Sequence, residues 1–200
     1  MTSVYLPRVR FPPAVERGSL PPKVETVELQ TMRKPVVGVM GGSKADAAAC
    51  ATAKELGSLI AGRGWVLLNG GRNTGVMAAS AEGAKEAGGT VIGILPDRTT
   101  SKASPHLDVA ICTDMGDARN LINVLSSDVV IACPGALGTL SEVVLALKHE
   151  KRVILLGFEL GPPFQKYLKS GQLSLAKNPQ DAIEQAAAAC RRFAAGENTG

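Results

Sequence analysis

Apolar and polar residues alternate in blocks from Pro35 onward, and the blocks come in two lengths. Short, continuous apolar runs that end in glycine or proline, such as "PVVGVMG", are typical of strands with both faces covered. Longer segments with apolar residues three and four positions apart predict amphipathic helices that stop at glycines. We expect strands at 35–41, 65–71, 90–96, 108–113, 128–135, 151–158 and 172–177, and helices at 45–64, 75–89, 114–127, 139–150, 162–171 and 178–195.

This alternation of strands and helices predicts βαβ units. Because such crossovers are right-handed, the units build a parallel sheet with helices on both faces. The expected fold is α/β: a Rossmann-like three-layer sandwich with a mainly parallel sheet of about six or seven strands. We expect the polar segment 97–107 to be a loop and Asp114 to cap the helix that follows the fourth strand.

Residues 1–34 differ from the rest of the chain. They hold five of the twelve prolines and show no periodicity, which predicts an extended or disordered N-terminal arm, or a purification or fusion remnant. We expect residues 35–200 to form the ligand-binding domain. The arm holds six Lys/Arg and three Asp/Glu, so most of the net charge of +4 belongs to it. With no long basic run in the domain and only 4% aromatics, nucleic-acid binding is not expected.

Other classes of protein find little support in the composition. No apolar run approaches the roughly 18 residues of a membrane span, and the N-terminus lacks the apolar core of a signal peptide. The cysteines are scattered without a CxxC pair, which favours reduced thiols in a cytoplasmic protein, and the two histidines are not spaced as metal ligands. These residues are Cys50, Cys112, Cys133, Cys190, His106 and His149.

Three of the expected strands end in glycine-rich turns, "GVMGGSK", "NGGRNTG" and "CPGALGT". One such turn would be ordinary turn chemistry. Three at the same edge of a sheet predict a phosphate-bearing ligand, because glycine lets the backbone approach a ligand and helix N-terminal amides bind anions. The candidate residues are Gly41, Gly42, Ser43, Lys44, Gly70, Gly71, Arg72, Asn73, Thr74, Gly75, Gly135, Ala136, Leu137, Gly138 and Thr139, together with Asn120.

The turns do not match the common nucleotide motifs. The dinucleotide fingerprint G-x-G-x-x-G is absent after the first strand, and no acidic residue follows the second strand to hold a ribose diol. The P-loop sequence is also missing. A nicotinamide-dependent dehydrogenase and a P-loop NTPase are therefore not expected.

Two charged residues lie beside these turns. Thr139 and Glu142 have the spacing of a capping box, which would give both a structural role. Arg119 lies near a helix start, where the helix dipole disfavours a cation, so it is also a candidate for holding an anion. If Arg119 and Glu142 converge above the strand ends, they form an acid/base and anion-holding pair.

The segments "GGRNTGVM", "EAGGTVIGILP", "ARN" and "PGALGTLSE" resemble the Lonely Guy and "lysine decarboxylase-like" superfamily, whose hallmark is P-G-G-x-G-T-x-x-E. Residues 35–158 are similar, more closely, to its molybdenum cofactor carrier branch, in segments such as "GVMGGSKAD", "GWVLLNGGRNTGVM" and "ARNLINVLSSDVV". No lysine site for pyridoxal phosphate accompanies the resemblance.

The resemblance implies two functions. The carrier branch binds the phosphorylated pterin of molybdenum cofactor, which would make this chain a cytoplasmic carrier or storage protein and a homo-oligomer, dimer or tetramer. Lonely Guy enzymes instead cleave the N-glycosidic bond of cytokinin nucleoside 5′-monophosphates, and their motif arginine and glutamate align with Arg119 and Glu142. Asn120 stands where those enzymes usually have lysine, and Ala136 stands at the second glycine of the hallmark. Phosphoribohydrolysis of cytokinin or purine monophosphates is therefore the alternative, and a ligand-sensing domain is a third.

Overall fold

In a computed structural model of the chain, residues 33–194 are described, with side chains to residue 191. The predicted arm lies outside the described residues except for its last two, and its boundary stays a prediction. The strands are β1 (Val36–Met40), β2 (Val66–Asn69), β3 (Thr90–Leu95), β4 (Val109–Cys112), β5 (Val129–Ala132), β6 (Arg152–Leu156) and β7 (Leu173–Ala176). The helices are α1 (Ala47–Gly62), α2 (Gly75–Glu86), α3 (Asn120–Leu125), α4 (Leu137–Lys148), α5 (Gln165–Ser170) and α6 (Pro179–Ala194), with 3-10 turns η1 (Gly116–Arg119) and η2 (Pro162–Phe164).

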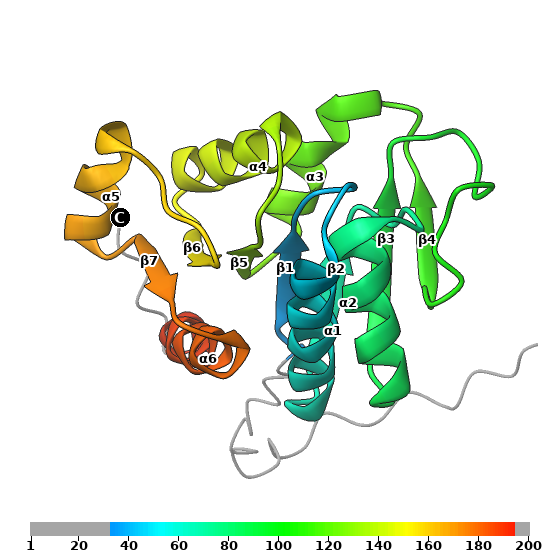
Figure 1. The fold of residues 1–200 in the computed structure, drawn as a ribbon, viewed down its shortest axis with the longest axis horizontal. Helices are drawn as coiled ribbons and strands as arrows, with labels where there is room; N and C mark the ends of the chain where they lie inside the picture. The colour runs from blue at the N-terminus through cyan, green and yellow to red at the C-terminus, as the bar shows by residue number, and fades with distance from the viewer. Residues whose placement is uncertain (1–32, 195–200) are drawn as a thin grey trace, which may run out of the picture. The chain divides into compact units, whose positions relative to one another are not determined.

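The seven strands form one parallel sheet in the order β4-β3-β2-β1-β5-β6-β7. Side chains alternate between its two faces, as the strand period requires. Helices α1, α2 and α6 cover one face of the sheet, and α3, α4 and α5 cover the other (Figure 1). Val37, Val39 and Ile131 belong to the core on the first face, and Met40 and Val130 to the core on the second. The predicted Rossmann-like three-layer α/β fold is confirmed.

Helices α1 and α2 lie side by side and touch through glycines (Figure 1). A Cβ atom at Gly57 would lie 2.1 Å from the carbonyl oxygen of Ser80, and one at Gly83 would lie 1.9 Å from that of Lys54. Backbone therefore packs on backbone, which only glycine permits. This close pairing fixes where α2, and the turn before it, meet the sheet.

The direction of the chain across the sheet reverses between β1 and β5. Strands β2 to β4 are added outward on one side of β1, and β5 to β7 on the other. The turns after β1 and β5 therefore lead to opposite faces and leave a crevice between them, which is where ligands bind in open α/β sheets.

At the opposite end of the sheet, Asp128 anchors the start of β1. Its carboxylate accepts hydrogen bonds from the Arg33 guanidinium and from the backbone N–H of Val36. Burial alone would raise the pKa of Asp128, but these hydrogen bonds outweigh it and hold the pKa below its usual value.

Two expectations about the segment from β4 to α3 are wrong. Asp114 does not cap a helix: it has a positive φ of 54° and pairs with Arg98, because the chain forms η1 before α3 begins at Asn120. Strand β4 is exposed rather than covered on both faces, and Cys112 is exposed with it. The reason is topological: β4 is an edge strand, and a loop rather than a helix connects it to β3.

Candidate functional site

The three glycine-rich turns are brought together at the carboxyl edge of the sheet. The backbone N–H of Gly42 donates to the carbonyl of Pro134 at 3.0 Å, and the carbonyl of Gly42 accepts from the N–H of Val76 at 3.1 Å. A Cβ at Gly135 would lie 2.8 Å from the Gly42 nitrogen, and one at Gly75 would lie 2.2 Å from the Gly42 oxygen. The glycines are therefore required by contact between the turns themselves.

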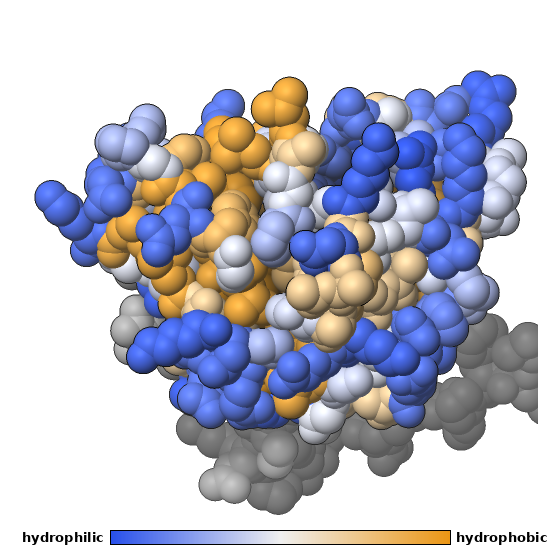
Figure 2. Space-filling model, in the orientation of Figure 1, coloured by the Kyte–Doolittle hydropathy of each residue, from blue (hydrophilic) through white to orange (hydrophobic). Residues whose placement is uncertain are grey.

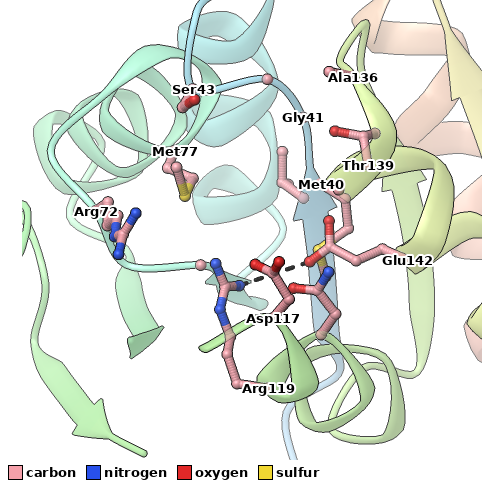
Figure 3. Close-up of a pocket in the computed structure, with 15 residues that line it drawn as sticks. Met40, Gly41, Ser43, Arg72, Met77, Asp117, Arg119, Ala136, Thr139 and Glu142 are labelled. Atoms are coloured by element: carbon pink, nitrogen blue, oxygen red, sulfur yellow. Dashed lines mark ion pairs between the residues drawn. The ribbon is translucent and has the colours of Figure 1, made fainter. Parts of the chain in front are cut away.

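These turns surround a pocket that lies at the point where the strand order reverses (Figure 3). Its walls come from the ends of β1 and β2, from α2, from η1 and α3, and from the first two turns of α4. The residues that line it are Val39, Met40, Gly41, Gly42, Ser43, Gly70, Arg72, Met77, Asp117, Arg119, Asn120, Ala136, Gly138, Thr139 and Glu142.

Arg119 and Glu142 face each other across the base of this pocket (Figure 3). The Nη1 atom of Arg119 lies 3.7 Å from Oε1 of Glu142, which is an ion pair without a hydrogen bond. The two side chains are 12% and 8% exposed. Burial lowers the pKa of Arg119, and the negative charge of Glu142 partly offsets this effect by raising it. The buried Nε atom of Arg119 has no hydrogen-bond partner among the described residues. A buried guanidinium that still has hydrogen-bond donors without partners is well placed to bind an anion.

Glu142 is held by a second residue from α3. The amide Nδ2 of Asn123 donates to Oε1 of Glu142 at 2.8 Å. Burial raises the pKa of Glu142, and the hydrogen bond from Asn123 and the charge of Arg119 oppose that rise. Asn123 was not a candidate from the sequence; its position four residues after Arg119 on the inner face of a helix is the signal that could have identified it.

Helix α4 begins at Leu137, so the predicted capping box is wrong. Ala136 occupies the N-cap position in an extended conformation and makes no side-chain cap. Thr139 is therefore inside the first turn, where it packs beside Gly135, and Glu142 is in the second turn facing α3. The first turn of a helix leaves backbone N–H groups without intrahelical partners and carries the positive end of the dipole. Here that turn forms one wall of the pocket.

The turn after β2 is shaped by Asn69, which sequence reasoning also missed. This buried side chain accepts from the N–H of Gly71 at 2.8 Å and donates to the carbonyl of Met77 at 2.9 Å and to Oγ of Ser80 at 3.1 Å. One amide side chain thus joins the turn after β2 to α2 by three hydrogen bonds, and it holds Gly70 beside the start of α2.

Arg72 occupies the opposite rim of the pocket and is tied down by Asp97. Its Nε and Nη2 atoms donate to the two carboxylate oxygens at 3.0 and 2.9 Å. The loop 97–107 is joined to the same turn by backbone hydrogen bonds from Asn73 to Lys102 and from Ser104 to Gly71. Two guanidinium groups, Arg72 and Arg119, thus line one pocket, with Asp117 and Glu142 as the acidic groups.

The structure separates the predicted candidates into two groups. Gly41, Gly42, Ser43, Gly70, Arg72, Arg119, Asn120, Ala136, Gly138, Thr139 and Glu142 line the pocket. The others do not line it: Lys44, Gly71, Asn73, Thr74, Gly75, Gly135 and Leu137. Gly71 and Gly75 instead adopt positive φ angles that shape their turns. The pocket is also lined by three apolar residues that the sequence did not predict, Val39, Met40 and Met77. In a sequence, apolar residues beside glycines cannot be distinguished from core residues.

An apolar groove adjoins the pocket. Ala136 and Thr139 line both, and Leu137, Phe158 and Leu160 help to line the groove. Figure 2 shows apolar surface gathered around this groove, over α4 and toward α5. Leu137 is 81% exposed, so a large apolar side chain stands at the mouth of the site.

Within residues 33–194, no three His, Cys, Asp or Glu side chains gather as metal ligands. No helix in the same range has the length and apolar character that a membrane crossing needs.

Solved structures with similar folds include two that are named for molybdenum cofactor. The molybdenum cofactor binding protein from Rippkaea orientalis is 52% identical, with a TM-score of 0.74, over 78% of this chain and 98% of that one. The molybdenum cofactor carrier protein from Chlamydomonas reinhardtii is 41% identical, with a TM-score of 0.72, over 80% of this chain and 99% of that one.

Curated relatives include enzymes. The cytokinin riboside 5′-monophosphate phosphoribohydrolase of Mycobacterium tuberculosis is 35% identical over 111 residues, which are 52% of this chain and 59% of that enzyme. An uncharacterised protein of Archaeoglobus fulgidus is 49% identical over 117 residues, which are 58% of this chain and 76% of that protein.

These similarities confirm both halves of the resemblance drawn from the sequence, to Lonely Guy proteins and to the cofactor carriers. The sequence profile of the SLOG cluster4 family matches residues 34–183, which include every residue that lines the pocket. The chain therefore belongs to the SLOG cluster4 family.

Proposed function

We propose that this protein binds a phosphorylated, nucleotide-like ligand, molybdenum cofactor, as a carrier or storage protein. The observation that carries the proposal is the pairing of an uncapped α4 N-terminus with a buried guanidinium in one pocket. Helix N-terminal amides and arginine together are the usual partners of a phosphate group. Similarity to two molybdenum cofactor proteins over nearly their whole length supports the choice of ligand.

The pocket also has surfaces for the rest of such a ligand. Ser43 and the Gly41–Gly42 backbone face the first turn of α4 across the crevice, where they complete a cradle for the phosphate. Met40 and Met77 provide a polarizable apolar surface for a flat ring system. Asp117 and Glu142 supply acceptors for the N–H groups of that ring.

Phosphoribohydrolysis is the second candidate function, and the facing of Arg119 and Glu142 favours it. In that reaction Arg119 would hold the substrate, and Glu142 would stabilise the oxocarbenium-like transition state or direct the attacking water. Water adds to the ribose carbon as the bond to the base nitrogen breaks, and the base leaves with a proton. Similarity to the mycobacterial enzyme supports this reading, while Asn120 and Ala136 depart from the enzyme motif.

Two measurements separate these functions. The full-length protein is purified from a host that makes molybdenum cofactor, and bound pterin and molybdenum are quantified. We expect stoichiometric pterin in the wild type, little in Arg119→Met, and wild-type amounts in Arg98→Met, which removes an exposed arginine outside the pocket. The same preparations are incubated with AMP and with a cytokinin riboside monophosphate, and free base and ribose 5-phosphate are assayed. Robust turnover that is lost in Glu142→Gln, with no bound pterin, would overturn the carrier proposal in favour of the enzyme.

A further inference from the structure

The inner face of α3 carries two asparagines where a helix of this fold would ordinarily pack apolar residues. Asn120 donates from Nδ2 to Oγ of Ser141 at 2.8 Å, and Asn123 donates from Nδ2 to Oε1 of Glu142 at 2.8 Å. Both bonds cross from α3 to α4. The first ties two neutral side chains together, whereas the second ends on the carboxyl group of the pocket.

Asn123 makes this bond at a cost. Its side chain is fully buried, and its Oδ1 atom has no hydrogen-bond partner among the described residues. Its Nδ2 atom also lies 3.9 Å from the Sδ atom of Met40, which is a weak acceptor. The opposite orientation of the amide would turn Oδ1 toward the carboxylate of Glu142, acceptor against acceptor. The hydrogen bond to Glu142 therefore favours the orientation that the amide adopts.

The bond fixes one oxygen of Glu142 and leaves the other open. Oε1 receives both the amide of Asn123 and the ion pair with Arg119. Oε2 is turned away from Arg119 (Figure 3), and no described residue hydrogen-bonds to it. A carboxylate held in this way presents one acceptor to the pocket in a fixed direction.

We infer that Asn123 is a positioning residue of the site, which holds the carboxyl group of Glu142 with Oε2 free as the acceptor for an N–H or O–H group of the ligand. The inference deepens the proposed function and rests on it for the identity of the ligand. It also gives a use to a buried polar residue that packing alone does not require.

The electrostatic surroundings of Glu142 make the role measurable. Among the described residues, Arg119 from η1 is the charged side chain that acts on its carboxyl group, and Asp117 acts on that guanidinium in turn. Asn123 from α3 and Met40 from β1 are neutral. Burial favours the neutral acid, and the amide of Asn123 favours the carboxylate. Removing the amide must therefore move the titration of Glu142 to higher pH.

The test is an NMR pH titration of the glutamate side-chain carboxyl carbons in the full-length protein, with the Glu142 signal assigned from its loss in Glu142→Gln. Wild type is compared with Asn123→Leu, which removes the amide at similar volume. The matched control is Asn120→Leu, which removes the side-chain hydrogen bond from Asn120 to Ser141 in α4, a bond that does not involve Glu142. We expect a higher midpoint for Glu142 in Asn123→Leu and an unchanged midpoint in Asn120→Leu.

An unchanged or lower midpoint in Asn123→Leu, or the same shift in both variants, would overturn the positioning role. If Asn123→Leu does not fold, Asn123→Ser answers the same question, since serine is too short to reach the carboxyl group. The titration needs no ligand. A failure to find bound pterin would therefore count against the proposed function and leave this result standing.

Discussion

The α-carbon of Gly70 lies directly against the guanidinium of Arg119. A Cβ at Gly70 would come within 2.6 Å of Nη1 and 2.7 Å of Nη2, and within 2.7 Å of the sulfur of Met77. Both neighbours are the ends of flexible side chains. The glycine is therefore required by the arrangement of the pocket more than by the stability of the fold.

We predict that Gly70→Ala separates function from stability. The methyl group should displace Arg119 and Met77, so bound pterin should fall at least about tenfold, while the free energy of unfolding changes by less than about 1 kcal/mol. Pterin content and urea denaturation of the same preparation measure the two effects. In a double-mutant cycle, Gly70→Ala should add little to the loss caused by Arg119→Met, since both act through one side chain. Independent, additive losses would contradict the shared cause.

The glycine at the contact between α1 and α2 should behave in the opposite way. In Gly57→Ala the new methyl meets fixed backbone, the Ser80 carbonyl, so the helices must move apart. We expect a loss of about 1–3 kcal/mol of stability, measured by denaturant unfolding. Gly62→Ala in the same helix is the control, because its Cβ would meet no atom within 4 Å, and it should be neutral or stabilising. Equal effects at the two positions would rule out a role for the contact.

Glu142→Gln should change the pH dependence of stability. The pKa of Glu142 is raised by burial above its ordinary value of 4.5, so above that pH the unfolded chain releases a proton that the folded one retains. This group therefore removes stability as pH rises through the window between 4.5 and the raised pKa. Glutamine does not titrate, so the variant should gain stability relative to wild type between about pH 4 and about pH 7. Unfolding free energies at the two pH values test the sign, and a relative loss on raising the pH would refute it.

Asp128→Asn should show the reverse trend. The folded-state pKa of Asp128 lies below its ordinary value of 3.8, because the hydrogen bonds from Arg33 and Val36 outweigh burial. The carboxylate thus contributes stability above pH 3.8 that is lost as pH falls through the lower folded value. We expect Asp128→Asn to be less stable than wild type at neutral pH, with the gap narrowing in acid. A gap that stays constant in thermal unfolding across this range would show that the charge is irrelevant.

The layers of the fold were predictable from the sequence because they follow from the spacing of apolar residues along the chain. The runs at 35–41 and 128–135 form β1 and β5, since short, uninterrupted apolar runs are typical of strands with both faces covered. Helix starts were harder. Asp114 is a good N-cap by type, yet the chain there turns through a positive φ, and local propensity did not reveal that backbone path.

The site was predictable where it depends on backbone and unpredictable where it depends on side-chain direction. The glycine-rich turns predicted the pocket, because the turns contact one another so closely that a residue with a Cβ atom would clash. The spacing of Thr139 and Glu142 matches a capping box, but the N-cap position is occupied by Ala136, three residues before Thr139, and Glu142 instead faces α3. The spacing of Asn123 from Arg119 could have drawn attention to Asn123, but its pairing with Glu142 joins two neighbouring helices and is not visible in the sequence of either one.

The reversal of strand order between β1 and β5 also governs when the site can form. Val37 pairs with Val129, so the two central strands are neighbours in space and remote along the chain. Closing so long a loop costs conformational entropy before any contact offsets it, and such nonlocal pairings are slow to form. A nascent chain that ends at β4 has the first two glycine-rich turns and no pocket between them. The proposed ligand recognition therefore requires the nearly complete domain, and a ligand bound in this pocket would stabilise the longest-range pairing of the sheet.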